Sequence, residues 1–312
     1  KLILIPDRIA PHKQIPSGSP SPEQRLEMIH IAASHYDKME VSDIELKREG
    51  PSYSYITVQQ IHEKYPDAKL VFIGPCIAKR KEARKVMIDV AEACLGCKFE
   101  AEPLIIGTSG RYEFHNKGLD IFMESLKRLA ACSLDREILA YITVPAANNG
   151  PRADLVRHLA DAAKPIDEKQ WKYSTHYIDN TQWDPISQSM RGSILEREDS
   201  KVKVIFVPSY LNSNDGVFNK NYYEMLVGMD VTAYPSYYEP WGYTPLESIA
   251  FSVPTITSNL SGFGLWAVKQ ADHKAVEVIR RDDNNDAYAI EQLVSATLRF
   301  MQLSPEEVVE VR

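Results

Sequence analysis

The 312-residue chain lacks the features that place a protein in a membrane or on nucleic acid. It has no apolar run long enough to cross a bilayer, and residues 2–6 form too short a run for a signal peptide. The formal net charge of −7 gives no general attraction to nucleic acid or anionic lipid, so any phosphate site must be local. With 44% hydrophobic and 25% charged residues, the chain is expected to be globular and cytoplasmic, with about two domains and no membrane or nucleic-acid partner.

Cysteine is also scarce, with four scattered residues. Cys94 and Cys97 have the spacing of half a zinc site or a redox pair, but no second cysteine pair or nearby histidine completes such a site. Ordinary cysteines at a helix end are the favoured interpretation, and no metal is expected. Residues 79–85 are strongly basic, yet Ala and Val follow at helical spacing, which favours a solvated helix face.

Residues 236–247 are the most informative stretch, because they carry two carboxylates, Glu239 and Glu247, with seven residues between them. Residues 229–235 are typical of a short buried strand, and residues 244–251 of a helix that begins at a Thr-Pro pair. Glu239 is therefore expected near the carboxyl end of a strand, and Glu247 about one turn into the following helix.

The start of that helix is expected to bind an anion, because its free N–H groups and helix dipole present positive charge. Together with the two acids and the flat ring of Trp241, it suits a sugar that carries a diphosphate leaving group. A simple surface turn is the alternative that this spacing alone leaves open.

A second charged loop follows the predicted strand 103–107 and precedes a helix at 119–129. Its Arg111 and Lys117 lie six positions apart around a glycine-flanked loop and could hold a diphosphate from two sides, although solvated surface charges are the simpler alternative. The stretch 260–264, which includes Ser261, comes just after the strand predicted at 255–257, and its small residues would let backbone approach a ligand.

The order of predicted elements after residue 100 is that of alternating strands and helices. The strands are expected at 138–144, 202–207, 231–234 and 255–257, and the helices at 119–131, 153–162, 221–228, 244–251 and 287–303. This order predicts a doubly wound, Rossmann-like parallel sheet with ligands at the carboxyl ends of its strands. Residues 163–200 are expected to be an irregular or helical insertion, in which His176 is structural.

From about residue 78 to residue 312 the chain resembles glycogen synthases of glycosyltransferase family 3. Two strings carry most of this resemblance: Tyr-Tyr-Glu-Pro-Trp-Gly-Tyr-Thr-Pro at 237–245 and Asn-Leu-Ser-Gly-Phe-Gly at 259–264. Shorter matches lie at 142–146, 175–176, 184–186 and 204–208. The resemblance implies the carboxyl-terminal half of a GT-B glycosyltransferase that transfers glucose from UDP-glucose to an α-1,4-glucan with retention and needs no metal or other cofactor.

The resemblance also assigns roles to individual residues. Arg111 and Lys117 would clamp the nucleotide diphosphate, Glu239 would be the acid beside the donor glucose, and Glu247 would hold the ribose or sugar. The nucleotide-sugar site would include the turn formed by Trp241, Gly242, Tyr243 and Thr244, with the backbone N–H groups of Tyr243 and Thr244 near the distal phosphate.

Residues 1–75 have a different pattern. A buried strand is expected at 2–6 and further strands at 41–46 and 69–73, with helices after residue 21 and up to residue 64. The Pro-His-Lys-Gln, Glu-x-Arg-Leu-x-Met and Glu-Leu-Lys-Arg-x-Gly-Pro-Ser-Tyr-Ser-Tyr strings resemble part of a nicotinate-nucleotide adenylyltransferase. That resemblance implies a pyridine-nucleotide site at His12 and Lys13.

We therefore expect three parts: an adenylyltransferase-like segment at 1–75, a linker helix within 76–100, and a nucleotide-sugar-binding domain at 101–312. The adenylyltransferase's His-x-Gly-His pair and the glycogen synthase's amino-terminal domain are both missing from the sequence. The sequence leaves three functions open: a transferase domain, an adenylyltransferase and an inactive composite. It also leaves open whether the protein forms a homo-oligomer and whether the two-part chain is a natural fusion or an artefact. We expect weak UDP binding and no elongation of glycogen.

Overall fold

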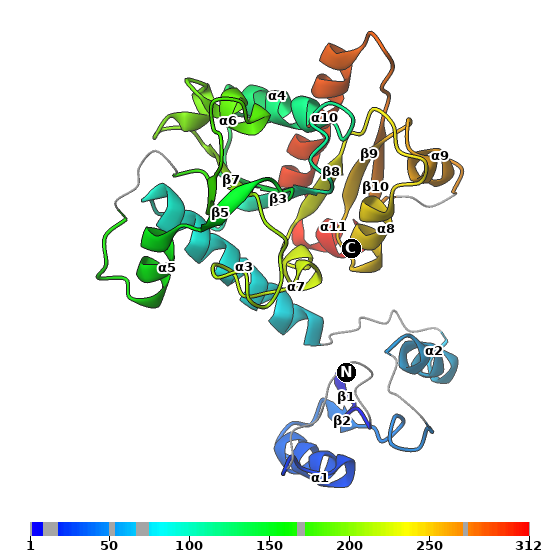
Figure 1. Ribbon diagram of the computed structural model, residues 1–312. Coiled ribbons are helices and arrows are strands. Elements are labelled where there is room, and N and C mark those ends of the chain that lie inside the picture. Colours follow the sequence, from blue (N-terminus) through cyan, green and yellow to red (C-terminus); the bar gives the residue numbers. More distant parts are fainter. Residues whose placement is uncertain are drawn as a thin grey trace. The chain divides into compact units, whose positions relative to one another are not determined.

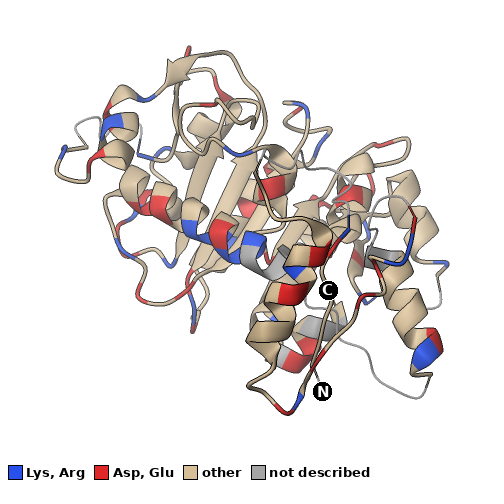
Figure 2. Cartoon of the chain, turned by 90° about the horizontal axis from the view of Figure 1, so that it is seen from below, with Lys and Arg blue, Asp and Glu red and all other residues tan. Residues whose placement is uncertain are grey.

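A computed structural model describes residues 2–8, 18–49, 54–66, 75–166, 172–270 and 274–311 (Figure 1). The chain divides into two compact units, Lys1–Gly74 and Pro75–Arg312. Acidic and basic residues are interspersed along the ribbon of the chain (Figure 2). No helix among the described residues combines the length and apolar character needed to span a bilayer.

The first unit contains a two-stranded parallel sheet, in which Leu2 pairs with Met39. Its described elements are β1 (Leu2–Leu4), α1 (Pro22–Ala33), β2 (Met39–Val41) and α2 (Ser54–Lys64). The prediction of a buried strand at 2–6 is wrong in length and burial, since Leu2 is 38% exposed. The strand predicted at 41–46 lies earlier, at β2, because residues 44–49 turn. The strand predicted at 69–73 falls outside the described residues.

The second unit is built on a six-stranded sheet in the order β10-β9-β8-β3-β4-β7, in which every pairing is parallel. Counted along the chain, this is the Rossmann order, with a switch point between its two middle strands, β3 and β8. The strands are β3 (Leu104–Ser109), β4 (Ile138–Thr143), β7 (Val202–Val207), β8 (Val231–Tyr234), β9 (Thr255–Ser258) and β10 (Val276–Ile279).

Helices cover both faces of this sheet (Figure 1), which confirms the predicted α/β class. On one face α4 (Leu119–Ala130) and α10 (Asp286–Gln302) pack together, while α3 (Pro75–Leu95), α5 (Ala153–Ala160) and α7 (Tyr222–Leu226) cover the other. The strands read as near-continuous apolar runs because both of their faces are buried. The remaining helices are α6 (Pro185–Met190), α8 (Tyr243–Ala250), α9 (Gly262–Ala267) and α11 (Pro305–Val311).

Helix α3 differs from the prediction of a solvated basic face. Arg80 and Arg84 turn inward to Asp230, with N···O distances of 2.6 and 2.9 Å. Burial raises the pKa of the Asp230 carboxyl, but the two guanidinium groups outweigh burial and hold the pKa below its ordinary value. The helix is thereby fixed to the sheet beside β8.

The predicted insertion at 163–200 is more regular than expected. It contributes β6 (His176–Ile178), which pairs antiparallel with β5 (Asn148–Pro151), then α6 and a short 3-10 turn. His176 is 2% exposed, its Nδ1 lies 2.8 Å from the Thr175 hydroxyl, and burial lowers its pKa. The predicted structural role for His176 agrees with this burial. Strand β10 and helix α9 were not predicted.

Candidate functional site

The loops after β3, β8 and β9 meet at one edge of the sheet, because these neighbouring strands are parallel and end there. Arg111, Glu239 and Ser261 lie on the three loops, as expected from the sequence. The loops after β3 and β8 flank the switch point. This is the position where open α/β sheets bind ligands.

Backbone hydrogen bonds hold the Glu239 loop to both neighbouring loops. Glu239 N–H donates to Leu260 O at 3.2 Å, and Gly262 N–H donates back to Glu239 O at 3.1 Å. On the other side, Tyr237 N–H donates to Asn116 O at 2.8 Å. These bonds fix the backbone on either side of the Glu239 carboxylate.

Gly118 lets the Lys117 loop approach the Glu239 loop closely. Its φ of 68° is in the left-handed region, and a Cβ at this position would collide with the carbonyl oxygen of Pro235. Because only glycine fits here without strain, the two loops can lie in backbone contact just before α4 begins.

Lys117 and Glu239 form an ion pair between Nζ and Oε2 at the switch point. The side chains are 16% and 21% exposed, so this pair lies largely out of solvent. The Glu239 carboxylate therefore does not lie in open solvent, because the loop after β3 supplies it with a cation. Two residues predicted to touch one ligand are brought together by strands that are neighbours in space.

Helix α8 begins one residue earlier than predicted, at Tyr243, with Gly242 at its N-cap. Gly242 has a φ of 102° and no side chain, so the first turn has no side-chain cap. The first turn therefore has N–H groups at Tyr243 and Thr244 that no capping side chain receives, whereas Pro245 has none. This geometry can receive an anion.

Glu247 is held by a tyrosine that the sequence did not point to. Tyr223 of α7 donates its hydroxyl to Glu247 Oε1 at 2.9 Å, and this hydrogen bond raises the pKa of the phenol. The Tyr223 ring stacks on Phe251, with centroids 5.0 Å apart. The carboxylate is thereby oriented from α7 as well as from its own helix.

A network of hydroxyl groups supports α8 beneath the site. Ser248 accepts from Thr232 at 2.9 Å, donates to Thr244 O at 3.0 Å, and lies 3.2 Å from the Tyr234 hydroxyl. Tyr234 lies 3.4 Å in turn from Ser109 at the end of β3. Hydroxyl side chains at the ends of adjacent strands were the only sequence signal for this network.

Arg111 does not join the Lys117–Glu239 pair. Its side chain is 76% exposed and lies 3.0 Å from Glu113. The next residue, Tyr112, is anchored instead: its hydroxyl donates to Asp184 and accepts from the N–H of Ile186 at 3.2 Å. The base of the loop is thus fixed while the Arg111 guanidinium stays in solvent.

Trp241 packs against two aromatic side chains of α9. It is 36% exposed, and its ring centroid lies 6.3 Å from that of Phe263 and 6.4 Å from that of Trp266 on α9. The predicted contact of this ring with a sugar stays a prediction.

Two further sequence predictions concern other sites. His12 and Lys13 lie outside the described residues, so their predicted pyridine-nucleotide site stays a prediction. Among the described residues, no group of three His, Cys, Asp or Glu side chains is arranged to hold a metal. Burial raises the pKa of Cys94 to about 12, which makes its thiol a poor ligand and nucleophile.

Comparisons with known proteins give the following matches. Residues 168–312 match the glycogen synthase family. The chain is 30% identical to the human liver glycogen [starch] synthase over 52% of the chain and 30% of that protein. It is 27% identical to the Neurospora crassa glycogen [starch] synthase over 69% of the chain and 39% of that protein. The chain thus spans between 30% and 39% of the length of these two relatives.

Solved structures give weaker likenesses. The catalytic domain of Arabidopsis thaliana starch synthase IV, bound to ADP and acarbose, has a TM-score of 0.41 and 13% identity, over 74% of this chain and 38% of that one. WaaG, a glycosyltransferase of lipopolysaccharide biosynthesis, has a TM-score of 0.38 and 14% identity, over 72% of this chain and 45% of that one. The sequence matches therefore carry the family likeness.

Proposed function

We propose that the second unit is the nucleotide-sugar-binding half of a retaining, GT-B glycosyltransferase of the glycogen synthase type. The donor would be UDP-glucose, the acceptor an α-1,4-glucan, and the location the cytoplasm. The observation that carries this proposal is the Lys117–Glu239 ion pair at the switch point of a Rossmann-ordered sheet, within the run that resembles the family.

In this proposal Lys117 binds the diphosphate of the donor. Its ammonium is largely out of solvent, where a charge-assisted hydrogen bond to phosphate is stronger than at an exposed site. The free N–H groups at the start of α8 would add donors for the same anion. These positive groups would stabilise the charge that develops on the departing phosphate, with no metal required.

The two acids would bind the other parts of the donor. Glu239 lies beside Lys117 and would face the glucose next to the diphosphate. Glu247, oriented by Tyr223, would accept from hydroxyl groups of the ribose or sugar. Arg111 is exposed and would have to swing from Glu113 to reach the phosphates.

Calorimetric titration with UDP tests this proposal. We expect weak binding to the whole chain, and Lys117→Ala should weaken it by about 1.5–3 kcal/mol through the loss of a charge-assisted contact. Lys127→Ala is the matched control, because Lys127 lies on α4 and pairs with Glu124 at 3.3 Å. No heat at millimolar UDP would refute the proposal, and unchanged affinity in Lys117→Ala would remove Lys117 from the site.

For the first unit, the adenylyltransferase resemblance remains a proposal that rests on its sequence strings. Stabilisation of the chain against heat by nicotinate mononucleotide or ATP would support it. If only UDP-glucose stabilises the chain, the adenylyltransferase proposal fails and nucleotide binding belongs to the second unit.

A further inference from the structure

Arg281 is a fully buried charge at the same edge of the sheet. It follows β10 by two positions, and none of its side chain is exposed. Burying a guanidinium is costly unless its donors are satisfied. Its contacts therefore indicate what the residue does.

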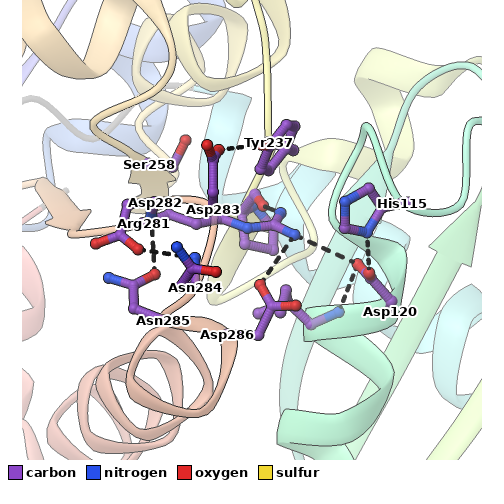
Figure 3. Close-up of polar contacts among 12 residues, drawn as sticks. His115, Asp120, Tyr237, Ser258, Arg281, Asp282, Asp283, Asn284, Asn285 and Asp286 are labelled. Atoms are coloured by element: carbon purple, nitrogen blue, oxygen red, sulfur yellow. Dashed lines mark hydrogen bonds and ion pairs between the residues drawn. The ribbon is translucent and has the colours of Figure 1, made fainter.

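Those contacts are with loops and helix ends (Figure 3). Nη1 donates to Pro235 O at 2.5 Å, while Nη2 lies 3.4 Å from an Asp286 carboxylate oxygen and 3.9 Å from one of Asp120. The guanidinium carbon is 5.2 Å from the centre of the Tyr237 ring. Arg281 thus joins the loop after β8 to the starts of α4 and α10.

Tyr237 is held by further partners (Figure 3). Its hydroxyl donates to Asp283, and its ring centroid lies 5.1 Å from that of His115. His115 Nδ1 lies 2.6 Å from Asp120. The start of the loop after β8 is therefore fixed by the loops that follow β3 and β10.

We propose that Arg281 is a positioning residue for the donor site, an inference that rests on the proposed function. Glu239 follows Tyr237 by two positions, and Lys117 follows Asn116, whose carbonyl accepts from Tyr237 N–H. Arg281 touches neither member of the ion pair. It fixes the backbone that sets where the Glu239 carboxylate lies relative to Lys117, and hence beside the sugar of the donor.

This role predicts a selective effect. UDP lacks the glucose that Glu239 would face, whereas UDP-glucose has it. A displaced Glu239 loop should therefore weaken UDP-glucose more than UDP. General damage to the fold would weaken both to the same extent.

The test measures both affinities by calorimetry in the whole chain. Arg281→Met is expected to weaken UDP-glucose by about tenfold, the effect of losing one hydrogen bond to a charged group, and to weaken UDP much less. Arg281→Lys, which keeps the charge and a donor for Pro235 O, should recover most of the loss. Arg299→Met is the control, since Arg299 is 56% exposed and pairs with Glu277 at 2.8 Å.

A second variant, Tyr237→Leu, removes the ring between Arg281 and His115 at a partly exposed position and should show the same selectivity. If Arg281→Met does not fold, Tyr237→Leu tests the positioning role in its place. Equal loss of both ligands, or no loss, would overturn the positioning role. If the unaltered chain binds neither ligand, the proposed function itself fails, and the inference fails with it.

Discussion

Helix α1 of the first unit leaves Met28 and Ile31 59% and 63% exposed, whereas α4 of the second unit buries Phe122 and Leu126 almost completely. The described residues of the first unit include a two-stranded sheet, and those of the second unit a six-stranded sheet with helices on both faces. Two strands rarely form a stable sheet without a layer packed against them. A helix therefore contributes to stability only where such a layer packs against its apolar side chains.

Helix capping does not account for this difference. Both units contain a capping box, formed by Ser21 and Gln24 at α1 and by Asn221 and Glu224 at α7. Caps of this kind specify where a helix begins. Burial decides how much that helix stabilises the chain.

The largest difference that we expect between the two units is in their rate of proteolysis. Under native conditions, a protease of broad specificity should cut the first unit at least about a hundredfold faster than the second, because regions with few buried contacts open more often. Mass spectrometry of the products should show a lasting fragment that begins near Pro75. Early cuts between β3 and β10 would contradict the comparison.

Asp230→Asn should destabilise the second unit by about 3–5 kcal/mol, because it leaves Arg80 and Arg84 without the largely buried carboxylate that they share. Urea unfolding measures this loss. Asp199→Asn is the control: Asp199 and its partner Arg197 are mostly exposed, and no measurable change is expected.

The same carboxylate predicts a dependence on pH. Since folding lowers the pKa of Asp230, its contribution is complete above the ordinary value of 3.8 and is lost as the pH falls through the lower folded pKa. The free energy of unfolding should therefore drop below about pH 4. Asp230→Asn should make this drop smaller, and an identical pH profile would show that other carboxylates cause it.

Truncation of a hydrophobic side chain should also cost more free energy of unfolding in the second unit than in the first, by a smaller difference. Leu126→Ala in α4 is expected to cost about 2–5 kcal/mol, because the cavity forms inside a packed layer. Ile31→Ala in α1 should change the free energy of unfolding by less than about 0.5 kcal/mol, because its side chain is already in solvent. A comparable cost for both would mean that α1 has a packing partner.

The smallest effect concerns the helix caps. Asn221→Ala should lower the stability of the second unit by about 1 kcal/mol through the loss of the N-cap bond. Ser21→Ala removes the same kind of bond and should leave the main thermal transition unchanged. A shift of that transition by Ser21→Ala would show that the two units unfold together.

Much of the second unit could be predicted from its sequence, because its strands are continuous apolar runs and its helices have clear periodicity. Strand β10 was missed, since Glu277 interrupts its short run, and α9 was missed because two glycines lie within its six residues. In the site, Glu239 and Lys117 were predicted as contacts of one ligand. Their ion pair was not, because it depends on β3 and β8 being neighbours.

Arg281 was also missed. In the sequence it lies within Arg-Arg-Asp-Asp, a run typical of a solvated turn. Its burial depends on the carbonyl of Pro235, 46 positions earlier, which no local pattern encodes. Residues that position others through backbone contacts leave little signal in a single sequence.

The strand order also sets when the site can exist during synthesis. Lys117 and Glu239 are 122 positions apart, which corresponds to roughly 6–24 s at about 5–20 residues per second on the ribosome. During that interval β3 can pair with β4, but the edge at Ile106 that will receive Val231 of β8 stays open. An open strand edge is a template for pairing with other chains. The arrangement that places the two loops together thus also makes the nascent chain vulnerable to association until β8 emerges.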